Sequence, residues 1–292
     1  MALVSSTPLL TRARRGGYGV VAFNVHTLEM LQAVVDAAQE ARAPLILQTT
    51  AGTVQHLGAD YIAAAAKVAA DSATVPIALH LDHCQDFDVI VRCLRAGYTS
   101  VMIDASMRPF ADNVAATLRV VEVARALGVN VEAELGKVGG VEDDIRVEDA
   151  DALLADPDEC GEFVRLTGVP TLAPAIGTAH GLYRGEPRID FGRLERIAAQ
   201  VAVPLVLHGG SGIPAGQMRR CVALGMAKVN VGTEMKHAFS GEIRRHFAEH
   251  PAETDPRRYM APAKAAVKEL ARAKMELCGC AGRADEAAGE RA

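Results

Sequence analysis

The amino-acid sequence predicts a single-domain α/β protein, a (β/α)8 barrel, and three observations point to this fold. Eight short aliphatic runs alternate with longer amphipathic stretches along the 292 residues, as expected for parallel strands joined by helices. Polar residues recur at or just after the C-terminal ends of these runs, which form one face of a barrel. The length also fits, since such barrels commonly occupy about 250 residues. An open, doubly wound sheet is the main alternative.

Two periodicities predict the individual elements. Short continuous apolar runs indicate buried strands, whereas apolar residues at i, i+3, i+4 and i+7 indicate helices. Leu31, Val34, Val35 and Ala38 follow the helical spacing behind Thr27, a suitable N-cap. The predicted strands are 20–23, 45–48, 77–81, 100–103, 130–133, 171–175, 205–207 and 228–231. The further predicted helices are 60–70, 87–96, 109–127, 190–200, 214–224, 234–248 and 261–275.

Composition excludes several classes of function. A net charge of -5 argues against a nucleic-acid or anionic-membrane partner, either of which requires a basic surface. No secretory leader and no apolar stretch of about 18 residues is evident, so we expect a cytoplasmic protein that does not contact a membrane. The six cysteines are then expected to be reduced thiols.

Two segments depart from the alternating pattern. The connection 135–156 is rich in glycine and acidic residues and is longer than a strand–helix turn requires, which is typical of a mobile lid or active-site loop. Small and charged residues fill the C-terminus, so we expect a barrel domain over 1–284 and a disordered tail over 285–292.

Three histidines are the leading candidates for chemistry. His83, His180 and His208 each follow a separate apolar run. Three imidazoles that converge from three strand ends would bind zinc and leave a fourth position open, as in catalytic zinc sites. A single histidine is more often structural, and this interpretation is kept for four others, namely His80 within its strand and His237, His246 and His250 on a late helix.

Asp82 directly precedes His83 and is a candidate for proton transfer. Neighbouring residues of a regular strand point to opposite faces, so the chain must turn here if both side chains are to face one site. A carboxyl group beside a metal ligand is well placed to move a proton to or from a substrate oxygen. The alternative is a solvated turn residue or a helix cap.

Two glycine-containing loops predict an anion site. The segment HGGSGIP, 208–214, enters a helix at Pro214, and NVGTE, 230–234, enters the next one. Backbone N–H groups at such positions bind phosphate, and the loops after strands seven and eight of a barrel are a frequent phosphate site. Glu134 ends the fifth strand, and Glu142 lies in the long connection, where the plain alternative is a solvated charge run.

Six motifs of the sequence resemble the class II, zinc-dependent ketose-bisphosphate aldolases, and the likeness extends from the first residues to about Ala284. The motifs are LHLDH (79–83), SVMIDAS (100–106), VEAELGKVGGVEDD (131–144), AIGTAHG (175–181), LVLHGGSGIP (205–214) and KVNVGTE (228–234). The resemblance implies reversible cleavage of a ketose 1,6-bisphosphate to dihydroxyacetone phosphate and glyceraldehyde 3-phosphate. It also implies that zinc polarises the ketose carbonyl and stabilises the resulting enediolate.

The resemblance assigns roles to residues of matching motifs. His83, His180 and His208 are the implied zinc ligands, Asp82 the proton donor, Glu134 a ligand for an alternative metal position, and Glu142 the acid/base at C1 of dihydroxyacetone phosphate. The implied binding residues for substrate phosphate and a monovalent cation, Na⁺ or K⁺, are Gly181, Arg184, Gly209, Gly210, Ser211, Asn230, Val231, Gly232 and Thr233. Arg257 resembles an arginine that reaches the second phosphate from a neighbouring subunit, which implies a homodimer or homotetramer.

The choice of ketose and two rival functions stay open. The segments NVGTEMKHAFS and CGCAGRA are closest to tagatose-1,6-bisphosphate aldolases, and Gly232 favours that type, whereas TLAPAIG and YRGEP also match the fructose-1,6-bisphosphate type. The two sugars differ only in configuration at C4. A Schiff-base aldolase with Lys228 or Lys137 as nucleophile is the rival enzyme. A non-catalytic sugar-phosphate-binding subunit is the remote alternative, since some tagatose-type relatives work with an accessory subunit.

Overall fold

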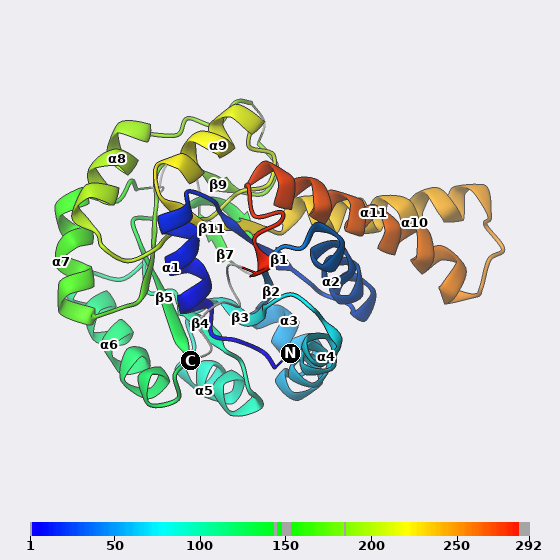
Figure 1. Ribbon diagram of the computed structural model, residues 1–292, viewed down its shortest axis with the longest axis horizontal. Helices are drawn as coiled ribbons and strands as arrows, with labels where there is room; N and C mark the ends of the chain where they lie inside the picture. Colours follow the sequence, from blue (N-terminus) through cyan, green and yellow to red (C-terminus); the bar gives the residue numbers. More distant parts are fainter. Residues whose placement is uncertain (1, 143–144, 148–152, 184, 286–292) are drawn as a thin grey trace.

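The computed structural model of the protein describes residues 2–142, 145–147, 153–183 and 185–285, and it confirms the predicted barrel. Eight parallel strands close in the order β1-β11-β10-β8-β5-β4-β3-β2, and all eight predicted runs are among them (Figure 1). The barrel strands are β1 (Val20–Asn24), β2 (Leu45–Thr50), β3 (Ile77–Cys84), β4 (Ser100–Ile103), β5 (Asn130–Leu135), β8 (Thr171–Pro174), β10 (Leu205–Leu207) and β11 (Met226–Val231).

Helices surround the sheet, and each predicted helix is present. These are α2 (Leu28–Ala41), α4 (Ala59–Ser72), α5 (Phe87–Ala96), α6 (Phe110–Ala126), α8 (Phe191–Gln200), α9 (Ala215–Ala223), α10 (Thr233–Glu249) and α11 (Pro256–Leu277). The Thr27 cap is confirmed, because its side chain accepts a hydrogen bond from the Met30 N–H. Helix α11 begins earlier than predicted because Asp255 caps it. Helices missed by the sequence analysis are α1 (Ser6–Gly16), α3 (Ala51–Leu57) and α7 (Pro157–Thr167).

Helix α1 covers the N-terminal end of the barrel. Its first side chains reach the first residues of two strands: the Ser6 hydroxyl lies 3.0 Å from Ser100 Oγ and Thr7 donates to Asn130 Oδ1 over 2.8 Å. At the periphery, α10 and α11 run side by side as an arm that projects away from the barrel (Figure 1). Among the described residues, no helix has the length and apolar character needed to span a membrane.

A small second sheet lies in the connections after β5 and β8. It consists of β6 (Gly139–Glu142), β7 (Ile145–Val147) and β9 (Ala179–His180), with β6 in the centre. Strand β6 pairs with β7 antiparallel and with β9 in parallel, and Gly140 is the partner of His180. The long connection 135–156 therefore includes a hairpin hydrogen-bonded to the strand that contains a predicted zinc ligand.

Candidate active site

The turn predicted between Asp82 and His83 is present. The register of β3 against β4 shifts between Leu81 and Cys84, and His83 has a φ of 44°, in the left-handed region that non-glycine residues rarely adopt. Because of this irregularity, Asp82 and His83 are both buried among polar groups of the site. Backbone conformations of this kind cost about 1–3 kcal/mol and cluster at functional sites.

The three predicted histidines converge. One ring nitrogen from each of His83, His180 and His208 lies within 4.8 Å of the others, and all three side chains are buried. The rings meet edge to face, with centroids 4.5 Å apart for His83 and His208 and 4.8 Å apart for His83 and His180. The three side chains therefore lie together, and their role as zinc ligands stays a prediction.

One detail of that prediction was wrong. His180 does not end the sixth barrel strand, because β8 ends at Pro174 and His180 lies in the separate strand β9. A turn through Gly177, which has a φ of 97°, intervenes. The position of His180 therefore depends on the small sheet as well as on the barrel.

Two buried carboxylates orient the rings of His83 and His208. His83 Nδ1 lies 2.9 Å from Asp104 Oδ2, and His208 Nε2 lies 2.8 Å from Glu132 Oε1. Burial alone would raise the pKa of either acid. Hydrogen bonds from His83 and Ser106 instead hold the pKa of Asp104 below its usual range. The charge of the Lys228 ammonium and the hydrogen bond from His208 likewise hold the pKa of Glu132 below its usual range. Both acids are therefore acceptors.

His208 gives its Nε2 proton to the hydrogen bond with Glu132, so Nδ1 of a neutral His208 ring carries no proton and faces His83. His208 Nδ1 and His83 Nε2 are 2.7 Å apart. Burial and then the neighbouring His83 lower the pKa of His208, which favours the neutral ring that a metal requires. A proton on His83 Nε2 can bridge the two nitrogens at this distance, and a metal cation that replaces that proton would bind both.

Glu134 supplies a further donor to the same point. Its side chain is buried, and Oε2 lies 3.6 Å from His208 Nδ1 without a hydrogen-bond partner in the described part of the chain. Burial and then the charge of Asp104 raise the pKa of this carboxyl group. Imidazole nitrogens with one carboxylate oxygen are the donor types of catalytic zinc sites, so the residues fit this metal.

Asp82 lies on the inner side of the barrel, where three amides fix its carboxylate. Gln48 donates to Oδ2 over 2.8 Å and Asn24 over 3.3 Å, while Asn230 donates to Oδ1 over 3.2 Å. The donors come from β1, β2 and β11, and the register that pairs Asn24 with Gln48 brings two of them together. The solvated-turn interpretation of Asp82 is thus wrong.

The two predicted phosphate loops also meet. A small pocket is lined by His180, Gly181, Gly209, Gly210, Ser211, Asn230, Gly232 and Thr233, a list that includes most of the predicted binding residues. The Gly210 N–H donates to the Asn230 carbonyl oxygen over 3.1 Å, which joins the loops. A Cβ at Gly210 would lie 2.5 Å from that oxygen, so the close approach requires glycine here. The adjoining Val231 is buried at the end of β11.

Three predicted residues are not brought to this site by the described structure. The backbone of Glu142 ends β6, next to the strand of His180, but its side chain lies outside what is described. Arg184 also lies outside the described residues. Arg257 lies in the first turn of α11, and this helix is part of the arm that projects from the barrel (Figure 1). The Arg257 side chain is 89% exposed and pairs with Asp255.

Sequence analysis missed Tyr183 and Glu132, and left His80 as a structural residue. The Tyr183 hydroxyl donates to the Gly209 carbonyl oxygen over 2.8 Å and accepts from the Ala179 N–H over 3.0 Å, so it ties β9 to the phosphate loop. Glu132 lies two residues before Glu134 and faces the same side of β5, a spacing that could have revealed it.

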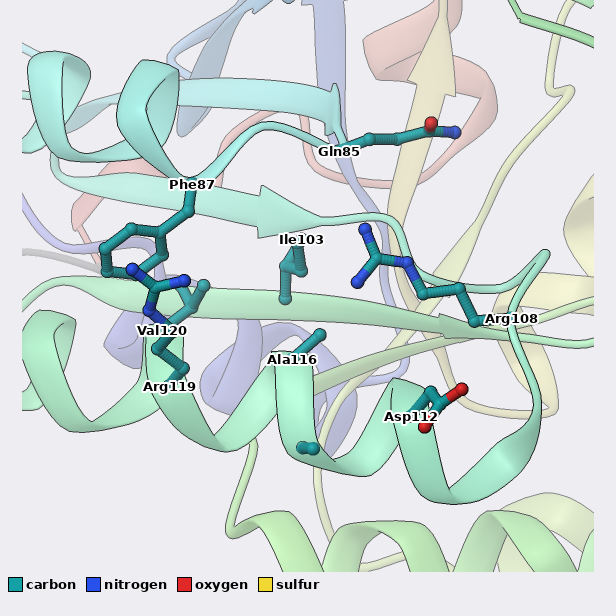
Figure 2. A pocket seen from close by; sticks show the side chains of 9 residues that line it. Gln85, Phe87, Ile103, Arg108, Asp112, Ala116, Arg119 and Val120 are labelled. Atoms are coloured by element: carbon teal, nitrogen blue, oxygen red, sulfur yellow. The ribbon is translucent and has the colours of Figure 1, made fainter.

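A groove outside the barrel contains none of the predicted site residues. It lies between α5 and α6, where Figure 2 shows Arg119 against the ring of Phe87, with Arg108 and Asp112 farther along. The Arg119 guanidinium carbon is 3.6 Å from the Phe87 ring centroid. A cation–π contact of this kind stabilises the packing of two helices.

Known proteins resemble this chain along nearly its whole length. The sequence profile of the class II fructose-bisphosphate aldolases matches residues 4–283. The D-tagatose-1,6-bisphosphate aldolase subunit GatY of Klebsiella oxytoca is 48% identical over 282 residues, which cover 97% of this chain and 99% of that protein.

Solved structures agree with this. The YdjI aldolase of Escherichia coli K12 has a TM-score of 0.86 at 34% identity, covering 97% of this chain and 99% of its own. A putative fructose-1,6-biphosphate aldolase of Coccidioides immitis has a TM-score of 0.86 at 33% identity, covering 96% and 97%. The chain is therefore a carbon–carbon lyase that belongs to the zinc-dependent class II fructose-bisphosphate aldolase family.

Proposed function

We propose that this enzyme reversibly cleaves D-tagatose 1,6-bisphosphate to dihydroxyacetone phosphate and glyceraldehyde 3-phosphate. The observation that carries the proposal is the convergence of His83, His180 and His208 beside a pocket formed by the two glycine loops. The preference for tagatose rests on the 48% identical tagatose-type relative and on Gly232. Fructose 1,6-bisphosphate, cleaved by the same chemistry, is the alternative substrate.

The metal we propose is Zn²⁺, held by His83 Nε2, His208 Nδ1 and His180, with Glu134 as ligand of an alternative position. When bound, zinc polarises the ketose carbonyl and stabilises the negative charge that develops there as C3–C4 breaks. A Na⁺ or K⁺ ion near Asn230 is a further proposal, supported by an Asn230 Oδ1 atom that is buried without a hydrogen-bond partner in the described residues.

Asp82 is the proposed base for cleavage. Its carboxylate would accept the proton of the C4 hydroxyl as the C3–C4 bond breaks, and would return it in condensation. The amides of Asn24, Gln48 and Asn230 hold the carboxylate in one orientation, so little rearrangement is needed before proton transfer.

Glu142 is the proposed acid that protonates C1 of dihydroxyacetone phosphate after cleavage. It ends β6, the strand that pairs with β9, so the hairpin is hydrogen-bonded to the strand of His180, and its closure is proposed to bring Glu142 to the reacting carbon. Closure of this hairpin would also exclude water from the reacting carbon.

The substrate phosphates are assigned to backbone and arginine groups. Gly181, the 209–211 loop and the 230–233 loop would bind the phosphate of dihydroxyacetone phosphate, and Arg184 is proposed as a further ligand of it. Arg257 would reach the second phosphate of a neighbouring subunit, which requires a homodimer or homotetramer. An accessory subunit is a further proposal, supported by the GatY relative, which is named as a subunit of its aldolase. A cytoplasmic location stays a prediction.

The Schiff-base alternative is disfavoured by the surroundings of Lys228. Its Nζ donates to Glu132 over 2.8 Å, and the side chain is 1% exposed, so the amine is held as a buried ammonium rather than as a free nucleophile. Lys137 remains the other candidate for that mechanism.

Metal removal tests the proposal. The purified chain alone should lose cleavage on complete chelation, regain it with Zn²⁺, and resist trapping by borohydride with substrate. Activity in fully demetallated protein, or a borohydride adduct at Lys137, would overturn the metal mechanism, and no turnover by the zinc-loaded chain would favour the binding-subunit alternative. With zinc bound, kcat/KM should be higher for tagatose than for fructose 1,6-bisphosphate; the reverse would exchange the two substrates.

A further inference from the structure

A buried ion pair below the three histidines has no part in the chemistry proposed above. Glu132 on β5 and Lys228 on β11 are 2.8 Å apart across the barrel interior, with exposures of 0% and 1%. Isolated charges at such positions would cost several kcal/mol, and pairing them reduces that cost without adding much stability. Stability alone therefore does not explain this pair.

Lys228 sets the direction of its hydrogen bonds with Glu132 and His80, because an ammonium group only donates. It donates to Glu132 Oε2, and the ionised Glu132 can only accept. The proton between Glu132 Oε1 and His208 Nε2, which are 2.8 Å apart, therefore belongs to His208. His208 is left with a bare Nδ1, the atom that faces His83.

The contact with Lys228 also determines which ring nitrogen of His80 carries the proton. Lys228 Nζ lies 3.2 Å from His80 Nε2, so this nitrogen accepts and His80 carries its proton on Nδ1. That proton is donated to Ser100 Oγ over 2.6 Å, near the end of the barrel that α1 covers. Burial and then the charge of Lys228 lower the pKa of His80 well below its usual range, in agreement with a neutral ring.

Glu132 is poorly placed to be a metal ligand itself. Oxygen and nitrogen atoms of His80, Asp82 and Glu132 also lie within 4.8 Å of one another. The Lys228 ammonium, however, is within hydrogen-bond distance of both Glu132 and His80, and a second cation there would be repelled.

We propose that Glu132, kept in place by Lys228, is a positioning residue that holds His208 in the tautomer with the proton on Nε2 and Nδ1 free for the metal. Mutation of a carboxylate that orients a ligand imidazole typically weakens metal binding by about 10- to 100-fold. The inference rests on the proposed function for its assignment of His208 as a ligand, but the tautomer itself is a property of the metal-free protein.

The test compares wild type with Glu132→Gln, using Glu122→Gln on the exposed face of α6 as the matched control. In ¹⁵N-histidine NMR of the metal-free wild type, the ring signals of His208 are assigned as those absent from the His208→Gln variant. These signals should show the tautomer with the proton on Nε2. Glu132→Gln should mix or reverse the tautomer and weaken Zn²⁺ binding about 10- to 100-fold in chelator competition. The visible bands of the Co²⁺-loaded protein should also change, whereas Glu122→Gln should match wild type throughout.

An Nδ1–H tautomer in wild type, or an unchanged tautomer and zinc affinity in folded Glu132→Gln, would overturn the inference. If the single variant does not fold, Glu132→Gln with Lys228→Met removes both charges and should show the same two changes. Failure of the proposed function is a different result, in which wild type binds no zinc while its His208 tautomer depends on Glu132.

Discussion

The two halves of the active site are constructed from different parts of the chain. The proposed metal half consists of side chains, since His83, His208 and Glu134 converge there and buried acids orient the two imidazole rings. The phosphate half consists largely of backbone, with glycines so close to neighbouring strands that a Cβ would collide. We therefore expect the metal half to be damaged by removing atoms and the phosphate half by adding them.

Removing a ligand from the metal half should have the largest effect. His83→Ala removes His83 Nε2, which lies 2.7 Å from His208 Nδ1, and leaves His208 as the only nitrogen donor of that pair. The Lewis-acid contribution of the metal, several kcal/mol, is then lost. We expect a loss of bound zinc and a fall in kcat/KM of about 10³-fold or more. Zinc analysis and a coupled cleavage assay measure both, and His237→Ala on the exposed face of α10 is the control. Full zinc content in His83→Ala would remove this residue from the ligand set.

Adding one carbon to the phosphate half should have an intermediate effect. A Cβ at Gly210 would lie 2.5 Å from the Asn230 carbonyl oxygen, so Gly210→Ala must separate the two loops. We expect KM for the bisphosphate to rise about tenfold, equivalent to about 1.4 kcal/mol, with zinc content unchanged.

Gly216→Ala is the matched control for this variant, because a Cβ there meets nothing within 4 Å. Steady-state kinetics should show wild-type KM for the control. An equal rise of KM in both variants, or loss of zinc from Gly210→Ala, would show that the two halves are not separable in this way.

The link between the halves should show the smallest effect. Tyr183 ties Ala179, beside the proposed ligand His180, to Gly209 of the proposed phosphate loop. Burial raises the pKa of Tyr183 to about 12, so the phenol remains a donor at neutral pH. Tyr183→Phe removes a hydrogen bond of about 1 kcal/mol, and we expect KM to rise about fivefold with kcat nearly unchanged. A kcat loss larger than the KM change would place Tyr183 in the chemical step instead.

The sequence allowed the metal half to be predicted better than its supports. Asp82, His83 and His208 come directly after apolar runs that form strands. Their residue types and positions can therefore be recognised in the sequence alone. Strand β9 was missed because two residues show no periodicity, and α3 because its seven residues give too short a pattern.

The supporting ion pair was missed for a different reason. Glu132 and Lys228 each lie two residues from a predicted site residue, Glu134 and Asn230, and so face the barrel interior with them. Their partnership joins β5 to β11 across 96 residues of sequence, and only the closed barrel brings them together. Spacing along one strand can predict the face, but not which distant strand completes the pair.

The most direct test of the account is the Asp82→Asn variant, because metal binding and proton transfer at C4 are assigned to different residues. The variant should keep zinc content at the wild-type level and still exchange deuterium into dihydroxyacetone phosphate, while cleavage of the bisphosphate falls about 10²- to 10⁴-fold. Cleavage at the wild-type rate in zinc-loaded Asp82→Asn would contradict the central claim.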